Sequence, residues 1–235
     1  MTGYVNSIQS LGGADGPGIR FTVFLQGCRL RCGCCHNPDT WQEKAAKEYT
    51  ALEIAKKAER YKEYFNEKGG ITLSGGEPLL QAEFSREIFS LCKERGINTC
   101  LDTSGSVMNQ SVKELLAVTD TVLLDIKYTQ EEQYRSYVGC ELEAVLDFLR
   151  YLDQKSIPTV IRQVIIPGLN DTEENIRKLA SLKASRGCVE KIELLPFRKL
   201  CSEKYQNLSI PFRFEDIPEP DAKKMEYLRE LLKKL

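Results

Sequence analysis

The sequence predicts an α/β protein with a parallel sheet, and two observations support this fold class. Six short apolar runs alternate with segments of helical periodicity, and neighbouring parallel strands need such crossover segments. Polar or reactive residues follow most of these runs at the point where a strand would end. That arrangement is typical of the active-site face of a (β/α) barrel. We therefore predict a partial, open (β/α)6 barrel of the TIM type, with its active site at the carboxyl ends of the strands.

The predicted strands are short runs rich in Val, Ile, Leu, Thr and Phe, which indicates buried strands. No Gly-rich dinucleotide fingerprint follows the first run, so a doubly wound nucleotide-binding sheet has little support. The first run leads directly into a cysteine-rich loop. In chain order the strands cover residues 21–25, 70–74, 97–102, 121–125, 159–166 and 191–195.

The predicted helices begin at residues that can cap them. Thr50 with Glu53, and Thr129 with Glu132, have the spacing of a capping box. Asp171 and Thr172 are favourable residues at the start of another helix. The helices cover residues 50–65, 81–95, about 110–117, a short stretch from 129, 141–154, 171–185 and the stretch from 221 onward.

We expect one domain over residues 1–235, without a linker. It comprises an N-terminal loop (1–20), a barrel core (21–200) and a C-terminal loop and helix (201–235). The 33 basic and 34 acidic residues nearly cancel, so no nucleic-acid or membrane partner is expected. The start of the chain does not resemble a signal peptide, and no apolar run reaches the length of a membrane span. Nine cysteines without such a signal indicate a reducing cytoplasm, and we expect a monomer.

Cys28, Cys32 and Cys35 have the spacing C-x3-C-x2-C, and Cys34 and His36 lie in the same stretch. Three thiolates on one loop can bind three irons of a [4Fe–4S] cluster and leave the fourth iron open for a small molecule. A structural zinc site completed by His36 or Cys34 is the alternative. Zinc modules usually have a second pair of ligands at a distance, and the chain has no second C-x-x-C or H-x-H. The spacing therefore favours the cluster.

Two carboxylates and a glycine pair end other predicted strands. Gly75 and Gly76 permit close approach of the backbone to a ligand. Asp102 and Asp125 end neighbouring strands, and the ordinary interpretation of each alone is a helix cap or a solvated loop end. Lys127 beside Asp125 is the pattern of a surface ion pair that contributes little stability.

The combination of these motifs is more specific than any one of them. The cysteine motif after a first strand, with residues 74–77 (SGGE) after a second, resembles the radical S-adenosylmethionine superfamily. Within it, the chain is similar to the glycyl-radical enzyme activases of the pyruvate formate-lyase type, from about residue 3 to residue 200. The stretches that carry this similarity are residues 15–20 (DGPGIR), 35–41 (CHNPDTW), 101–103 (LDT) and 194–197 (LLPF).

The resemblance implies an oxidoreductase that reductively cleaves S-adenosylmethionine to a 5′-deoxyadenosyl radical. That radical would take a hydrogen from a glycine of pyruvate formate-lyase and leave a glycyl radical there. The implied cofactors are one [4Fe–4S] cluster, S-adenosylmethionine and a monovalent cation, Na⁺ or K⁺. The implied partners are the glycyl-radical enzyme and a reduced flavodoxin or ferredoxin. An activase of a different glycyl-radical enzyme, a small-molecule radical enzyme and an electron carrier without turnover are the alternatives. No room for a ferredoxin-like insert exists between Asp39 and Thr50, which favours the formate-lyase type.

The resemblance also implies roles for individual residues. The cluster ligands would be Cys28, Cys32 and Cys35, and Asp15 would meet the substrate loop. The cation would be held by Asp102, Thr103, Leu123 and Asp125. The residues implied for S-adenosylmethionine are Cys34, Cys35, His36, Gly75, Gly76, Glu77, Asp125, Ile126, Lys127, Arg162 and Arg198. Two of these depart from the family pattern, because Cys34 replaces a usual aromatic residue and Arg198 replaces a histidine.

Overall fold

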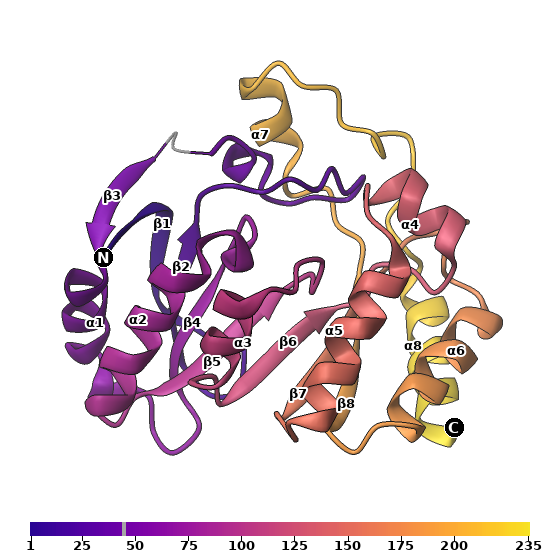
Figure 1. The fold of residues 1–235 in the computed structure, drawn as a ribbon. Coiled ribbons are helices and arrows are strands. Elements are labelled where there is room, and N and C mark those ends of the chain that lie inside the picture. The colour runs from indigo at the N-terminus through magenta and orange to yellow at the C-terminus, as the bar shows by residue number, and fades with distance from the viewer. Residues whose placement is uncertain (44–45) are drawn as a thin grey trace. The chain divides into compact units, whose positions relative to one another are not determined.

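The computed structural model describes residues 1–43 and 46–235 and contains an open, mostly parallel sheet of eight strands in the described residues (Figure 1). Their order is β3-β1-β2-β4-β5-β6-β7-β8. The bounds are β1 Thr2–Gly12, β2 Arg20–Leu25, β3 Lys47–Thr50, β4 Gly70–Gly75, β5 Asn98–Thr103, β6 Thr121–Asp125, β7 Thr159–Ile165 and β8 Val189–Pro196. The predicted fold class, a partial open (β/α) barrel, is confirmed.

The six predicted strands are present as β2 and β4 to β8, with ends that differ by at most two residues. The pairs β2–β4, β4–β5 and β7–β8 are parallel. Gly75, Thr103 and Asp125 are the last residues of β4, β5 and β6. The polar residues noted in the sequence therefore do lie at the carboxyl ends of parallel strands.

The predicted N-terminal loop over residues 1–20 is wrong. Strand β1 takes up most of it and pairs antiparallel with β2 on one side and with β3 on the other. Two register irregularities interrupt the pairing of β1 with β2, and few residues of β1 are buried. A largely exposed strand of this kind is held by backbone hydrogen bonds to its two neighbours, so it shows no clear alternation of apolar residues.

The chain divides into two compact units. Unit 1 comprises residues 1–29 and 39–123, and unit 2 comprises residues 30–38 and 124–235. The expectation of a single domain stays a prediction.

In unit 1, alternate residues of β2 and β4 divide into an apolar and a polar set. The apolar set is Phe21, Val23, Ile71 and Leu73, and the polar set is Arg20, Thr22, Thr72 and Ser74. Helices cover the sheet of this unit (Figure 1), with apolar side chains such as Ile88 and Phe89 fully buried. The elements are η1 Pro38–Thr40, α1 Ala51–Glu59, η2 Lys62–Tyr64, η3 Pro78–Gln81, α2 Ala82–Glu94 and α3 Gln110–Leu116. Residue 38 itself falls in unit 2.

Of the two predicted capping boxes, one is present and one is not. The box of Thr50 and Glu53 is present at the start of α1, although α1 ends at Glu59 and not near Phe65. The box at Thr129 is wrong, because the next helix, α4 Glu131–Tyr137, begins after Gln130 without a side-chain cap. The Thr129 hydroxyl donates instead to Asn175 Oδ1, 2.8 Å away. A tertiary partner has replaced the local one.

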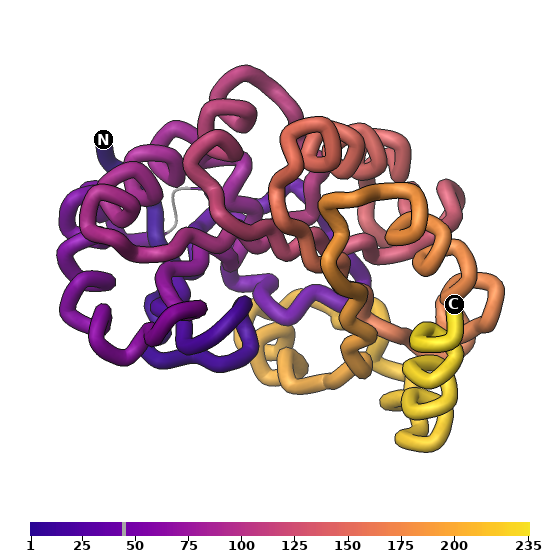
Figure 2. The backbone as a smooth tube through the Cα atoms, turned by 90° about the horizontal axis from the view of Figure 1, so that it is seen from below, coloured from indigo at the N-terminus to yellow at the C-terminus, as the bar shows by residue number. Residues whose placement is uncertain are grey.

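In unit 2, α8 lies beside α6 (Figure 2), and the Tyr227 hydroxyl hydrogen-bonds Glu173 between them. Thr172 and Asp221 cap these two helices, as the sequence suggested. The described helices include none that is long and apolar enough to cross a membrane. The remaining helices of this unit are α5 Leu142–Gln154, α6 Glu173–Ala184, α7 Ser202–Asn207 and α8 Ala222–Lys234.

The C-terminal loop predicted before the last helix, over residues 201–220, is partly wrong. It contains α7 and buries three aromatic side chains. Tyr205 and Phe212 stack with ring centroids 4.7 Å apart, and Phe214 packs on Phe197 at 6.3 Å. Three aromatic residues separated by irregular spacing give no periodic signal, so sequence reasoning took this stretch for a loop.

Candidate active site

The cysteine loop is held by backbone hydrogen bonds on both sides of the unit boundary. In unit 2, the Cys35 N–H donates to the Cys32 carbonyl at 3.1 Å, which closes a tight turn. The N–H groups of Arg31 and Gly33 donate to carbonyls at the end of α4, at 3.0 and 2.9 Å. In unit 1, the Cys28 N–H donates to the Trp41 carbonyl at 3.3 Å. The loop backbone is therefore fixed at each of the three predicted cluster ligands.

His36 and Arg198 meet through a backbone group. The His36 Nε2 atom lies 2.9 Å from the Arg198 carbonyl oxygen, so the nitrogen donates and carries the proton. The Arg198 side chain is paired with Glu219 and is half exposed. The predicted contacts of these two side chains with S-adenosylmethionine stay predictions, and both side chains have protein partners in this structure.

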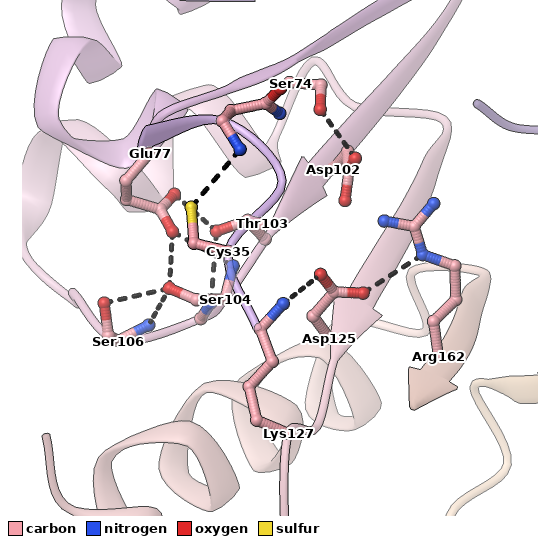
Figure 3. Close-up of polar contacts among 12 residues, drawn as sticks. Cys35, Ser74, Glu77, Asp102, Thr103, Ser104, Ser106, Asp125, Lys127 and Arg162 are labelled. Atoms are coloured by element: carbon pink, nitrogen blue, oxygen red, sulfur yellow. Dashed lines mark hydrogen bonds and ion pairs between the residues drawn. The ribbon is translucent and has the colours of Figure 1, made fainter. Parts of the chain in front are cut away.

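Asp125, Lys127 and Arg162 form a charged cluster in unit 2 (Figure 3). The Asp125 Oδ2 atom lies 2.6 Å from Lys127 Nζ, and its Oδ1 atom lies 3.1 Å from Arg162 Nε. Only 18% of the Lys127 side chain is exposed, so the surface ion pair suggested by the sequence is wrong. Ile126 between them is buried, and its N–H donates to the Arg162 carbonyl at 2.9 Å.

Burial and pairing act in opposite directions on the charges of this cluster. Burial favours the neutral form of Asp125, but Arg162 and Lys127 outweigh it and lower the pKa of that carboxyl group. Burial likewise opposes the charge of Lys127, and Asp125 with nearby thiols raises the pKa of the Lys127 ammonium well above its usual value. All three groups therefore stay ionised at neutral pH.

Only glycine fits at positions 75 and 76, because a side chain there would clash with the backbone near the end of β2. A Cβ atom on Gly75 would lie 2.5 Å from the Leu25 nitrogen, and one on Gly76 would lie 2.3 Å from the Gly27 carbonyl oxygen. Gly75 also has a φ of +105°, in a region that favours glycine. The sequence interpretation invoked close approach to a ligand, and the structure shows a close approach to the end of β2.

Glu77 is buried, with 2% of its surface exposed, and its carboxylate is occupied by donors from unit 1. It accepts hydrogen bonds from Thr103 Oγ1 at 2.6 Å, Ser104 N at 3.0 Å and Leu79 N at 3.1 Å, and also from the Ser104 hydroxyl (Figure 3). Burial raises the pKa of Glu77, and these four donors oppose that shift. Glu77 thus fixes the stretch that follows β5, and sequence reasoning missed Ser104 as its partner.

The other predicted residues of unit 1 also have partners. Asp102 Oδ2 accepts a hydrogen bond from the Ser74 hydroxyl at 2.7 Å. Leu123 is buried in β6. Asp15 Oδ2 accepts from the Thr22 hydroxyl at 3.1 Å, and the Asp15 carbonyl accepts from Thr72 Oγ1 at 2.7 Å. Asp102, Thr103 and Leu123 belong to unit 1, whereas Asp125 belongs to unit 2.

Comparison with known proteins decides the family. The family model of the "Radical SAM superfamily" matches residues 22–180. A "Pyruvate formate-lyase-activating enzyme" from Clostridium pasteurianum is 46% identical over all of this chain and 99% of its own length. A "Pyruvate formate-lyase 1-activating enzyme" from Escherichia coli (strain K12) is 40% identical over 99% of this chain and 96% of its own length. The chain belongs to the radical SAM superfamily and, within it, to the pyruvate formate-lyase-activating enzyme family.

Two solved structures share the fold. Streptococcus suis SuiB bound to precursor peptide SuiA has a TM-score of 0.72 at 15% identity, over 92% of this chain and 46% of that chain. A domain of pyruvate-formate lyase-activating enzyme from Bacteroides vulgatus has a TM-score of 0.59 at 26% identity, over 71% of this chain and 94% of that one. The predicted membership of the superfamily is confirmed, and it displaces the structural zinc site.

The donor set of this family member fits an iron–sulfur cluster. None of the nine cysteines, all of which lie in the described residues, forms a disulfide, and Cys28, Cys32 and Cys35 are partly exposed. Cys34 is 8% exposed, and burial raises the pKa of its thiol to about 11. Over residues 1–43 and 46–235, no three Cys, His, Asp or Glu side chains surround a single metal-ion position. A cubane takes one thiolate per iron, so its ligands need not converge on one point.

Proposed function

We propose that this radical SAM protein activates a glycyl-radical enzyme, pyruvate formate-lyase, by generating its glycyl radical. The observation that carries the proposal is the C-x3-C-x2-C loop with three accessible thiols, in a chain that matches activating enzymes over its full length. When bound, the cluster supplies one electron that breaks the carbon–sulfur bond between the sulfonium and the ribose of S-adenosylmethionine. Cleavage would release methionine and leave an adenosyl carbon radical, which would take a hydrogen atom from the glycine Cα to give 5′-deoxyadenosine and the glycyl radical.

Cys28, Cys32 and Cys35 would hold the cluster as thiolates. The tight turn at Cys32–Cys35 and the bonds to the end of α4 support this role, since they fix the loop without using the sulfur of Cys32. Cys34, which is buried, would stay outside the ligand set.

Residues at the end of β6, directly after it and in β7 would bind S-adenosylmethionine through their charged side chains and backbone groups. A zwitterionic amino-acid group needs both anionic and cationic partners, and the Asp125–Lys127–Arg162 cluster supplies both in fixed geometry. Ile126 would contribute backbone and apolar surface. The family pattern adds Cys34, Cys35, His36, Gly75, Gly76, Glu77 and Arg198 to this set.

The family pattern also assigns Na⁺ or K⁺ to Asp102, Thr103, the Leu123 carbonyl and Asp125. Hard oxygen donors suit such an ion. Asp102 and Thr103 are the last two residues of β5, and Asp125 is the last residue of β6, which supports a role for them as ligands.

Asp15 would meet the glycine-bearing segment of the partner. Its carboxylate is held by Thr22 and its backbone by Thr72, so the charge is fixed before a partner arrives. A reduced flavodoxin or ferredoxin would supply the electron. We further propose that the protein acts as a monomer in the reducing cytoplasm, where its nine cysteines, none of them in a disulfide in the described residues, stay reduced.

The test is anaerobic reconstitution with iron and sulfide, followed by reduction and addition of S-adenosylmethionine. Formation of 5′-deoxyadenosine measures the cleavage, and electron paramagnetic resonance of added pyruvate formate-lyase measures the glycyl radical. Cys32→Ala is the negative control. Cleavage without a glycyl radical on pyruvate formate-lyase would point to another glycyl-radical partner or to a small-molecule substrate. If the protein binds a cluster but does not cleave S-adenosylmethionine, the remaining function is that of an electron carrier.

A further inference from the structure

Residues 198–214, here termed the covering segment, contact the cysteine loop of unit 2 at four points. The Arg198 carbonyl binds the His36 ring at 2.9 Å. Lys204 Nζ donates to Asn37 Oδ1 at 3.1 Å, and the Tyr205 hydroxyl donates to the Cys35 carbonyl at 3.1 Å. The Phe214 ring lies so close to Gly33 that a Cβ atom there would be 2.4 Å from it. The contacts reach four of the five residues from 33 to 37.

The sulfur of Cys35 is itself part of this arrangement. The Asn37 N–H donates to Cys35 Sγ at 3.4 Å, which Figure 3 draws as a dashed line from the sulfur. Lys204 holds the side chain of the same asparagine. A backbone donor is thus aimed at a predicted cluster ligand, and an ammonium group fixes the residue that carries it.

The covering segment is anchored by packing, so its contacts are not those of a loose loop. Tyr205 is 3% exposed and stacks on Phe212. Phe214 packs against Tyr137 at 5.6 Å between ring centroids, and the Tyr137 carbonyl accepts the Gly33 N–H. The same aromatic residues therefore fix both the covering segment and the loop below it.

We propose that Lys204 and Tyr205 are positioning residues that hold the Cys35–Asn37 turn and raise the reduction potential of the cluster bound there. This inference rests on the proposed function, because it requires a cluster on Cys35. A reduced cluster carries more negative charge on its sulfur ligands, so hydrogen bonds and positive charge near them favour the reduced state. The Asn37 N–H, the Lys204 ammonium and the Tyr205 hydroxyl all present the positive end of a dipole or charge toward this turn.

The test compares Lys204→Met, Tyr205→Phe and the double variant with matched controls. Each substitution removes one polar group and keeps most of the packing. Lys178→Met removes a lysine paired with Glu174 at 2.8 Å on α6, and Tyr227→Phe removes a hydroxyl bonded to Glu173. After anaerobic reconstitution, iron and sulfide content are measured, and the reduced fraction is titrated by electron paramagnetic resonance.

We expect full iron content and a lower potential in both positioning variants. At a fixed applied potential the ratio of reduced to oxidised cluster should fall about threefold in each, or about 28 mV for one electron, and further in the double variant. Loss of iron from these variants alone would also support a holding role. A double variant with wild-type iron and potential would overturn the inference, as would equal shifts in the controls. A wild-type protein that takes up no cluster would instead overturn the proposed function.

Discussion

Four cysteines within eight residues of chain differ in how far solvent reaches them. Cys28, Cys32 and Cys35 are partly exposed, whereas Cys34 is buried. The spacing separates Cys34 from the other three, and the structure adds an independent reason for the same division. A buried thiol whose pKa is raised by that burial is a poor ligand for a cluster assembled on the loop surface.

We predict that Cys28→Ala, Cys32→Ala and Cys35→Ala each lose the cluster and all activity, while Cys34→Ala keeps its iron. The measurements are iron and sulfide content and the absorbance near roughly 400 nm after anaerobic reconstitution. Retention of iron in Cys35→Ala together with its loss in Cys34→Ala would reverse the ligand assignment.

The two aspartates at the ends of β5 and β6 give a second prediction. Asp102→Asn and Asp125→Asn should each weaken S-adenosylmethionine binding and make it less responsive to added K⁺ or Na⁺. If both aspartates serve one ion, the double variant should bind S-adenosylmethionine only slightly less tightly than the single variant with the lower affinity. Calorimetric titration with and without the salt measures this.

Asp147→Asn is the matched control, because Asp147 is an exposed carboxylate paired with Arg150. Additive losses of affinity with an unchanged response to the cation would mean that the two aspartates have only structural roles. Asp102 would then serve only to bind Ser74, and Asp125 only to pair with Lys127 and Arg162.

At the scale of elements, the loops after the strands are built by the chain's own hydrogen bonds. Glu77 accepts hydrogen bonds from Thr103, the last residue of β5, and from the backbone and hydroxyl of Ser104, which follows it. The covering segment likewise makes hydrogen bonds to the cysteine loop. These bonds preorganise groups that a ligand would otherwise have to order.

We expect Glu77→Gln to lower the free energy of unfolding by about 2–4 kcal/mol, because an amide nitrogen would then face buried donors. Urea unfolding followed by circular dichroism is the measurement. Glu83→Gln is the control, since Glu83 is an exposed carboxylate that accepts from the Ser111 hydroxyl. Equal, small effects of the two changes would show that the Glu77 cluster contributes little.

The start of α1 gives a prediction that depends on pH. Thr50→Ala should lower the free energy of unfolding by about 1 kcal/mol, as loss of a capping residue usually does. The hydrogen bonds from the Thr50 backbone and side chain lower the pKa of Glu53 below its ordinary value of 4.5. The contribution of Glu53 is therefore complete above pH 4.5 and lost as the pH falls through the lowered value.

Glu53→Gln should accordingly be less stable than the wild type at neutral pH and equal to it in acid. Urea unfolding over a pH series tests this. A difference that stays constant into acid would mean that the carboxylate charge has no part in the cap.

For the whole molecule, we expect cleavage of S-adenosylmethionine to be separable from transfer of the radical to a partner protein. Asp15→Asn should reduce glycyl-radical formation about tenfold, the equivalent of about 1.4 kcal/mol. Uncoupled cleavage should barely change, because the substitution leaves the cysteine loop and the Asp125 cluster intact. Electron paramagnetic resonance of the partner and a 5′-deoxyadenosine assay measure the two functions.

Asp171→Asn is the control, because Asp171 is a loop carboxylate that accepts from the Gly168 N–H at 2.9 Å. Equal suppression of both functions by Asp15→Asn would mean that the loop of residues 12–18 serves the cofactor or the fold, and not the partner.

The sequence by itself determined the six parallel strands, the caps at Thr50, Thr172 and Asp221, and the family. These features depend on local patterns: β-branched runs, side-chain caps and cysteine spacing are all readable within a few residues.

Only the tertiary structure decided the partners of the site residues. Glu77 with Ser104, Asp125 with Arg162 and Cys35 with Tyr205 are separated by 27, 37 and 170 positions. Strand β1, the missing cap at Thr129 and the covering segment were unpredictable for the same reason. Each is stabilised by hydrogen bonds or ring packing to residues distant in the chain, and such bonds leave no periodic pattern in the sequence around them.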